Sequence, residues 1–225
     1  MHLSIGGIEP FTAIDFPGKL AAVAFCRGCG WRCGYCHNPH LLPVAPGDDW
    51  SMIETFLDSR RGLLDGIVFS GGEPLLQSGL GEALKRCREM GFATALHTGG
   101  NSPTRLERVL PLLDWVGFDV KAPFDAYTAV TGVPGSGDKV QESLDRLLNS
   151  GVNYEVRTTV DPALLDRQQL LVLALELRSR GVSHYALQVC RSETPAAKPD
   201  PLTDKELVQQ ISNLFDTFEL RGTLN

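Results

Sequence analysis

Apolar runs that suit buried strands alternate with helical patterns along almost the whole chain. The expected strands cover residues 19–25, 66–70, 92–97, 115–120, 154–160 and 184–189. Such alternation predicts a parallel sheet with crossover helices. Six strand–helix units in 225 residues fall short of a complete eight-unit barrel, which needs about 250 residues. The fold class is therefore α/β, as an incomplete (β/α)6 barrel or an open doubly wound sheet.

The helices between these strands have recognisable ends. Residues 51–61 carry an apolar stripe, and Pro103 suits the first turn of a later helix. Gly181 is expected to end the helix over residues 168–180. The sequence Thr203-Asp204-Lys205-Glu206 has the pattern of a capping box, which predicts a last helix through Phe215. Because no long linker divides the units, we expect one domain over residues 1–225.

The amino terminus and the charge exclude several classes of protein. Residues 1–7 contain no positive region followed by an apolar stretch, so we expect no secretory signal and a cytoplasmic protein. The apolar run at residues 20–26 is far shorter than the roughly 20 residues that span a bilayer. A formal net charge of −6 offers no broad basic field for nucleic acid or an anionic membrane.

Four of the six cysteines are crowded together where the first strand ends, at Cys26, Cys29, Cys33 and Cys36. In a reducing compartment, close cysteines point to metal or redox chemistry. A four-thiolate zinc site is one interpretation, but paired zinc knuckles usually stand about 15–20 residues apart. A disulfide or a buried pair at Cys29 and Cys33 is another, and the glycine-rich flanks argue against it.

The spacing Cys29-x3-Cys33-x2-Cys36 favours an iron–sulfur cluster. A complete four-iron site takes four thiolates, so three would leave one iron with an open coordination position, as catalytic metal sites require. We treat Cys26 as a packed thiol outside this set. For Cys190 we expect a packed thiol, and a position facing the mouth of the barrel is the alternative.

With Tyr35 directly before the last cysteine, this triplet resembles the radical S-adenosylmethionine (SAM) superfamily. The segments GCGWRCGYCHNP at residues 28–39 and AIDFPG at residues 13–18 are similar to glycyl-radical-enzyme activases. Among these, the activating proteins of anaerobic ribonucleoside-triphosphate reductase resemble the chain most. The resemblance implies a [4Fe-4S] cluster on the three cysteines, with SAM on the open iron. It implies cleavage of SAM to a 5′-deoxyadenosyl radical and a glycyl radical on a partner enzyme. A small electron-donor protein such as a flavodoxin is implied as well.

The resemblance also assigns residues to SAM. Gly71, Gly72 and Glu73 follow the second expected strand, where glycines permit close backbone approach and a carboxylate can accept from an ammonium group. Asp119 and Lys121 end the fourth strand, beside the SAM carboxylate and ribose in the family.

Three more assignments follow from the resemblance. Arg157 would pair with the SAM carboxylate, and a structural ion pair with Glu155 or Asp119 is the alternative. Tyr35 and His37 would contact the adenine side.

The chain departs from the family in two places. His97-Thr98-Gly99-Gly100 stands where well-known activases have Asp-Thr-Asn-Gly, which removes a carboxylate near the SAM sulfonium and leaves the role of His97 open. The sixth strand lacks the histidine of the pyruvate formate-lyase activases.

Two alternative functions remain. A radical SAM enzyme acting on a small molecule, of the deazaguanine-precursor type, would have a small closed pocket. A zinc-binding structural or interaction module would contain zinc without iron and sulfide.

Overall fold

The computed structural model describes residues 3–46, 50–190 and 198–222, so Met1 and His2 of the segment considered for a secretory signal lie outside the described residues. Within these ranges an eight-stranded sheet has its strands in chain order. The strands are β1 (Ile5–Thr12), β2 (Ala21–Cys26), β3 (Gly66–Gly71), β4 (Ala93–Thr98), β5 (Trp115–Asp119), β6 (Asn153–Val160), β7 (His184–Val189) and β8 (Thr217–Arg221). β1 runs antiparallel to β2, and each later strand runs parallel to its neighbour.

The six expected strands are confirmed as β2 to β7, and the structure adds a strand at each edge. Ile5–Thr12 contains two glycines and Pro10 in place of an apolar run, and Thr217–Arg221 has mostly exposed residues. Edge strands tolerate such residues because one side of the strand is not paired within the sheet. In the described residues the strand order ends at β1 and at β8, which confirms an incomplete α/β barrel.

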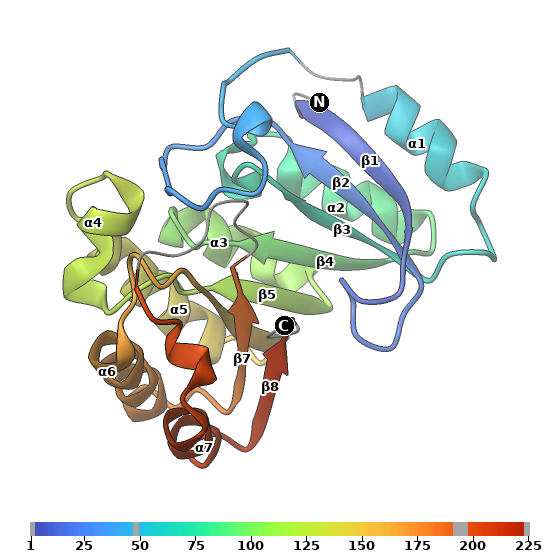
Figure 1. Ribbon diagram of the computed structural model, residues 1–225. Helices are drawn as coiled ribbons and strands as arrows, with labels where there is room; N and C mark the ends of the chain where they lie inside the picture. Colours follow the sequence, from blue (N-terminus) through green and yellow to red (C-terminus); the bar gives the residue numbers. More distant parts are fainter. Residues whose placement is uncertain (1–2, 47–49, 191–197, 223–225) are drawn as a thin grey trace.

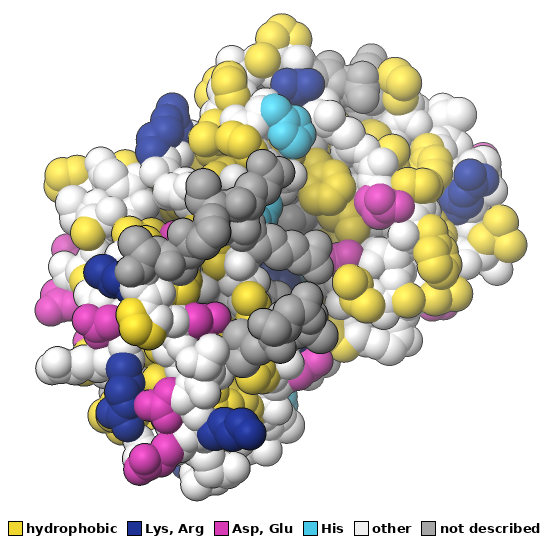
Figure 2. All heavy atoms as spheres, viewed as in Figure 1, with side chains coloured by type: hydrophobic (Ala, Val, Ile, Leu, Met, Phe, Trp, Pro, Cys, Tyr) yellow, Lys and Arg dark blue, Asp and Glu magenta, His cyan; other side chains and the backbone are white. Residues whose placement is uncertain are grey.

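Helices pack on the outer face of the curved sheet (Figure 1). They are α1 (Trp50–Asp58), α2 (Leu80–Glu89), α3 (Pro103–Val109), α4 (Tyr127–Thr131), α5 (Ser136–Leu148), α6 (Arg167–Ser179) and α7 (Lys205–Ser212). Short 3-10 turns lie at Pro39–Leu41, Pro74–Leu76, Leu110–Leu112, Phe124–Ala126 and Pro201–Thr203. Among the helices of the described residues, we find none with the length and apolar character needed to cross a membrane. On the face drawn in Figure 2, positively and negatively charged side chains of the described residues lie among one another.

The predicted start and end of the last helix are wrong. The capping residue of α7 is Asp204, whose Oδ1 accepts a hydrogen bond from the backbone N–H of Leu207 at 3.0 Å. The Thr203 hydroxyl instead donates to the carbonyl of Asp200 at 2.7 Å. Neighbouring residues can both cap a helix, and the preceding turn at Pro201–Thr203 decides in favour of Asp204. The helix ends at Ser212, before Phe215.

The two faces of the sheet differ because successive side chains of a strand point in opposite directions. The outer face joins the helices in the main apolar cluster. On the inner face, near the amino-terminal ends of β2 to β5, a second cluster contains Phe16, Ala21, Val23, Val68, Ala95 and Trp115. Phe16 comes from the β1–β2 connection and stacks on Trp115 with ring centroids 6.2 Å apart. Toward the carboxyl ends the inner face becomes polar.

Candidate functional site

A cavity of about 270 Å³ lies at the carboxyl ends of the parallel strands. Its walls come from the strand ends and from the loop that follows β2, drawn in blue in Figure 1. Every residue that the sequence assigns to the site lines this cavity: Cys29, Cys33, Tyr35, Cys36, His37, Gly71, Gly72, Glu73, Asp119, Lys121 and Arg157. Side chains far apart in the sequence therefore meet where parallel α/β folds place their ligands.

Backbone hydrogen bonds fix the loop after β2 on both sides. The Gly28 N–H donates to the Leu41 carbonyl at 2.8 Å, and the Gly28 carbonyl accepts from the Glu73 N–H at 2.9 Å. A Cβ atom on Gly72 would lie 2.4 Å from that carbonyl oxygen, closer than any side chain tolerates. Gly72 is therefore required for the loop after β3 to approach residues 27–38, which we call the cysteine loop.

Trp31 anchors the middle of the cysteine loop. Its ring is 5% exposed and meets Tyr127 edge-on, with centroids 5.9 Å apart. A Cβ atom on Gly99 would lie 2.4 Å from the Trp31 ring, so the indole sits directly on the backbone after β4. The Arg32 N–H donates to the Thr131 carbonyl at 2.9 Å. The short helix α4, which the sequence did not predict, therefore supports the cysteine loop.

The four cysteines at the end of β2 and after it lie in two different places. Cys29, Cys33 and Cys36 line the cavity, whereas Cys26 is fully buried in the outer apolar cluster and is absent from the cavity wall. Burial raises the pKa of the Cys29 thiol to about 11, and it also raises the pKa of Cys33. The Trp31 N–H donates to Cys29 Sγ at 3.4 Å.

This donor set fits an iron–sulfur cluster better than a single zinc ion. In the parts of the chain that the structure describes, no three His, Cys, Asp or Glu side chains are arranged to hold one metal ion. A cluster instead distributes its thiolates over separate irons, so its ligands need only surround a shared space. Three cysteines around one cavity, with hydrogen bonding to sulfur, meet that condition.

Glu73 is a buried carboxylate, 2% exposed, that joins the ends of β3 and β4. Its Oε1 accepts from the Thr98 hydroxyl at 2.7 Å and from the Leu75 N–H at 3.1 Å, and its Oε2 accepts from the Gly99 N–H at 3.0 Å. Burial raises the pKa of Glu73, and these donors oppose the rise. An ionised carboxylate has about four acceptor positions, so room for about one further donor remains on the cavity side.

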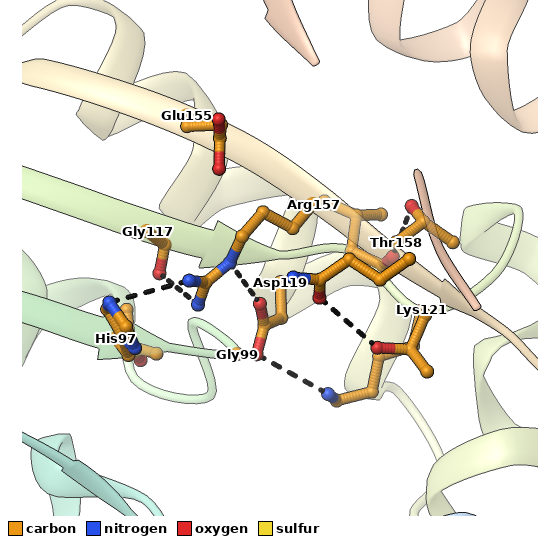
Figure 3. A network of polar contacts seen from close by, with 12 residues as sticks. His97, Gly99, Gly117, Asp119, Lys121, Glu155, Arg157 and Thr158 are labelled. Carbon is orange, nitrogen blue, oxygen red and sulfur yellow. Dashed lines mark hydrogen bonds and ion pairs between the residues drawn. The ribbon is translucent and has the colours of Figure 1, made fainter. Parts of the chain in front are cut away.

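A charged network crosses the inner face of β4, β5 and β6 (Figure 3). Arg157 is 7% exposed, and its Nε donates to Asp119 Oδ1 at 2.9 Å. Its Nη2 lies 3.5 Å from the Gly117 carbonyl, and its Nη1 lies 3.4 Å from His97 Nε2. Burial alone would raise the pKa of Asp119, but the charges of Arg157 and Lys121 outweigh it and lower the pKa. The ion pair with Asp119 is therefore present while Arg157 still faces the cavity.

Lys121 is the second cation of the cavity. Its Nζ lies 4.0 Å from Asp119 Oδ2, and it stands 6.0 Å from the Trp31 ring centre and 5.9 Å from that of Tyr35. Burial alone would lower the pKa of Lys121, but Tyr35 and Asp119 outweigh it and raise the pKa. The ammonium group therefore stays charged at the cavity wall, where it can meet an anionic ligand.

Several lining residues are missing from the sequence-based set. They are Trp31, Asn38, Leu42, Ser70, His97, Thr98, Gly99, Thr159 and Gln188. Thr159 follows Arg157 by two positions on β6, so the alternation of the strand could have identified it. Trp31 and Asn38 lie inside the cysteine loop, and sequence spacing gave no signal for the contacts they make.

A larger outer cavity of about 910 Å³ adjoins the first, and the two share Tyr35, Cys36, His37, Thr159 and Gln188. Its other walls include Ile14 and Asp15 of the β1–β2 connection, with Cys190 and Arg221 opposite. Cys190 is half-buried in this wall, so the expectation of a packed thiol is only partly met. The space beside the cysteines is therefore not a small closed pocket.

Comparisons with known proteins identify the family of the chain. Residues 23–172 match the sequence profile of the Radical SAM superfamily. A Methanocaldococcus jannaschii protein, MJ1227, whose name describes a glycyl-radical enzyme activating enzyme, is 30% identical over 195 residues, covering 84% of this chain and 80% of that protein. The pyruvate formate-lyase-activating enzyme of Clostridium pasteurianum is 35% identical over 176 residues, covering 73% of this chain and 71% of that enzyme.

Solved structures share the fold. The crystal structure of Streptococcus suis SuiB bound to S-adenosylmethionine matches with a TM-score of 0.63 at 15% sequence identity, over 87% of this chain and 45% of that chain. The sequence profile, the relatives and the fold lead to the same conclusion. The chain belongs to the radical SAM superfamily, and its relatives there include glycyl-radical-enzyme activating enzymes.

Proposed function

We propose that this protein uses a [4Fe-4S] cluster and SAM to generate a glycyl radical on a partner enzyme. The observation that carries the proposal is the shared cavity, in which three cysteine thiols face the charged groups of Glu73, Lys121 and Arg157. When bound, the cluster and SAM supply one-electron chemistry that yields a 5′-deoxyadenosyl radical. The protein's own part is to bind, orient and exclude water.

The residues divide this work according to charge. Cys29, Cys33 and Cys36 would hold the cluster and leave one iron for SAM. The two cations, Lys121 and Arg157, favour the SAM carboxylate, and the remaining acceptor position of Glu73 suits its ammonium group. Tyr35 and His37 would contact the adenine side, while Gly71 and Gly72 let the backbone approach the ligand.

An anaerobic ribonucleoside-triphosphate reductase is the partner that we propose. The names of the M. jannaschii and C. pasteurianum relatives support a glycyl-radical enzyme as the partner class. The likeness of residues 28–39 to activating proteins of the anaerobic reductase supports the narrower choice. The outer cavity, about 910 Å³, offers more room than the inner one, which favours a polypeptide segment over a small molecule. We further propose a single radical SAM domain over residues 1–225, a cytoplasmic location and a flavodoxin-like electron donor.

The decisive experiment combines cysteine variants with electron paramagnetic resonance. Cys29→Ala, Cys33→Ala and Cys36→Ala should each lose iron, sulfide and SAM cleavage after anaerobic reconstitution. Cys26→Ala is the matched control and should keep all three, because its thiol lies on the outer face of β2. Zinc without iron and sulfide in the wild-type protein would contradict the proposal.

The partner is tested in the same samples. With SAM and a reductant, the wild-type protein should produce a glycyl radical signal on anaerobic ribonucleotide reductase. A pyruvate formate-lyase provides the comparison. A signal on the lyase and none on the reductase would overturn the choice of partner and keep the activase function. Turnover of a deazaguanine precursor with no radical on either protein would overturn both.

A further inference from the structure

His97 stands between two segments that are far apart in the sequence. Its side chain, 9% exposed, projects from the inner face of β4 and meets Trp115 edge-on, with ring centroids 5.6 Å apart. Its Nε2 lies 2.9 Å from the backbone carbonyl oxygen of Asp15 and 3.4 Å from Arg157 Nη1. Asp15 lines the outer cavity and Arg157 lines the inner one. A single ring nitrogen therefore contacts the walls of both cavities.

The chemistry of these contacts determines which of them is a hydrogen bond. A carbonyl oxygen only accepts, so the contact with Asp15 requires a hydrogen on Nε2. Burial, reinforced by the charge of Arg157, lowers the pKa of His97 to about 3, so the imidazole is neutral with this nitrogen protonated. Nε2 then has no lone pair for Arg157, and their contact is packing. Nη1 therefore finds no acceptor on His97 and can donate to a ligand in the inner cavity, whose wall includes Arg157.

The other two nitrogens of the guanidinium contact β5. Nε is bonded to Asp119, and Nη2 lies over the Gly117 carbonyl. A Cβ atom on Gly117 would lie 2.7 Å from Arg157 Cζ, so the guanidinium lies directly against this glycine (Figure 3). With Gly117 beneath it and His97 against Nη1, the group has little freedom to rotate.

We propose that His97 is a positioning residue that holds one wall residue of each cavity in place. Its Nε2–H holds the Asp15 carbonyl, and with it Ile14, at the rim of the outer cavity. Its ring packs against Nη1 and keeps the Arg157 side chain in place at the wall of the inner cavity. The hydrogen bond to Asp15 is the first arm of the proposal and is a property of the protein alone. The positioning of Arg157 is the second arm, and it rests on the proposed function, because the ligand there is SAM.

Hydrogen–deuterium exchange tests the first arm on the full chain, purified under nitrogen without added SAM. His97→Ala should speed exchange across residues 12–18 by about threefold to tenfold, which corresponds to the loss of one hydrogen bond. His97→Gln keeps an N–H donor and should restore slow exchange. Ile67→Val, a small change in the outer core of β3, is the control for general destabilisation and should leave this segment unchanged.

SAM binding tests the second arm, by calorimetry on the reconstituted protein. His97→Ala should weaken binding about tenfold through the freed guanidinium. Gly117→Ala should weaken it similarly, because the new methyl group displaces Arg157, yet leave exchange at residues 12–18 unchanged. The two variants therefore separate the arms.

Each outcome has a defined meaning. Unchanged exchange in His97→Ala, or fast exchange in His97→Gln, would refute the hydrogen bond to Asp15 as the tether. Unchanged SAM affinity in both His97→Ala and Gly117→Ala would refute the positioning of Arg157. A wild-type protein that carries its cluster but binds no SAM would overturn the proposed function, and the exchange experiment would still decide the tether.

Discussion

The inner face of the sheet has two halves that are stabilised in different ways. Between β2 and β5, Phe16 and Trp115 fill the amino-terminal end with apolar contacts. Between β5 and β8 the interior holds ion pairs: Arg157 with Asp119 at 2.9 Å, and Arg221 with Glu155 at 2.7 Å. Apolar burial adds net stability, whereas ion pairs removed from water add little and fix orientation instead. The apolar half therefore holds the sheet together, and the charged half is the one that we propose orients SAM.

Substitution in the apolar half should affect stability most. Phe16→Ala should lower the free energy of unfolding by about 3 kcal/mol, because a ring that is 3% exposed leaves a cavity. Urea denaturation followed by circular dichroism measures the change. The SAM dissociation constant of the folded protein should stay within about threefold of wild type. A larger loss of SAM-binding free energy than of unfolding free energy would contradict the division of roles between the two halves.

Substitution in the charged half should affect binding most. Arg157→Met should raise the SAM dissociation constant about 30-fold, or about 2 kcal/mol, because the cation facing the ligand is lost. Its stability should fall by only about 1 kcal/mol, since Lys121 remains 4.0 Å from Asp119. Calorimetry and urea denaturation give the two values.

Arg221→Met is the matched control for this substitution. It removes an ion pair from the same half, but Arg221 lies outside the wall of the inner cavity. Its SAM affinity should match that of wild type. Equal losses of affinity in both variants would show that net charge matters, and that the contact made by Arg157 does not.

His97 lies between the two halves and should make the stability of the protein depend on pH. His97 has its pKa lowered to about 3 by burial and by Arg157, so the folded protein keeps it neutral while the unfolded chain protonates it below about pH 6.5. Its contribution to the free energy of unfolding therefore falls as the pH drops below 6.5, by up to about 1.4 kcal/mol per pH unit. His97→Gln removes this contribution and should lose stability less steeply between pH 6.5 and 5. Parallel curves for the two proteins would mean that the folded state also protonates His97.

The parts of the molecule that sequence predicted are those with local signals. The cysteine loop is contiguous, and Glu73 and Lys121 follow apolar runs whose ends mark one edge of a parallel sheet. The strands β2 to β5 are almost entirely buried, so their apolar runs were visible.

The parts that sequence missed depend on partners brought together by folding. His97 reaches Asp15 across 82 positions, and no pattern at either residue indicates the contact. The edge strands β1 and β8 have too few apolar residues to be recognised as strands. Phe16 lies within the motif AIDFPG, whose sequence carries no signal for the apolar packing of this ring on Trp115.

The contact between Gly117 and the Arg157 guanidinium has a consequence for protein engineering. Gly117 has no side chain to offer, yet it supplies the space in which the guanidinium lies. Transplanting this arginine onto another parallel sheet would therefore mean moving two positions on adjacent strands, one with arginine and one with glycine. A graft that copied every polar side chain but kept a bulky residue in place of Gly117 would have the same polar groups. It would have no space for the guanidinium.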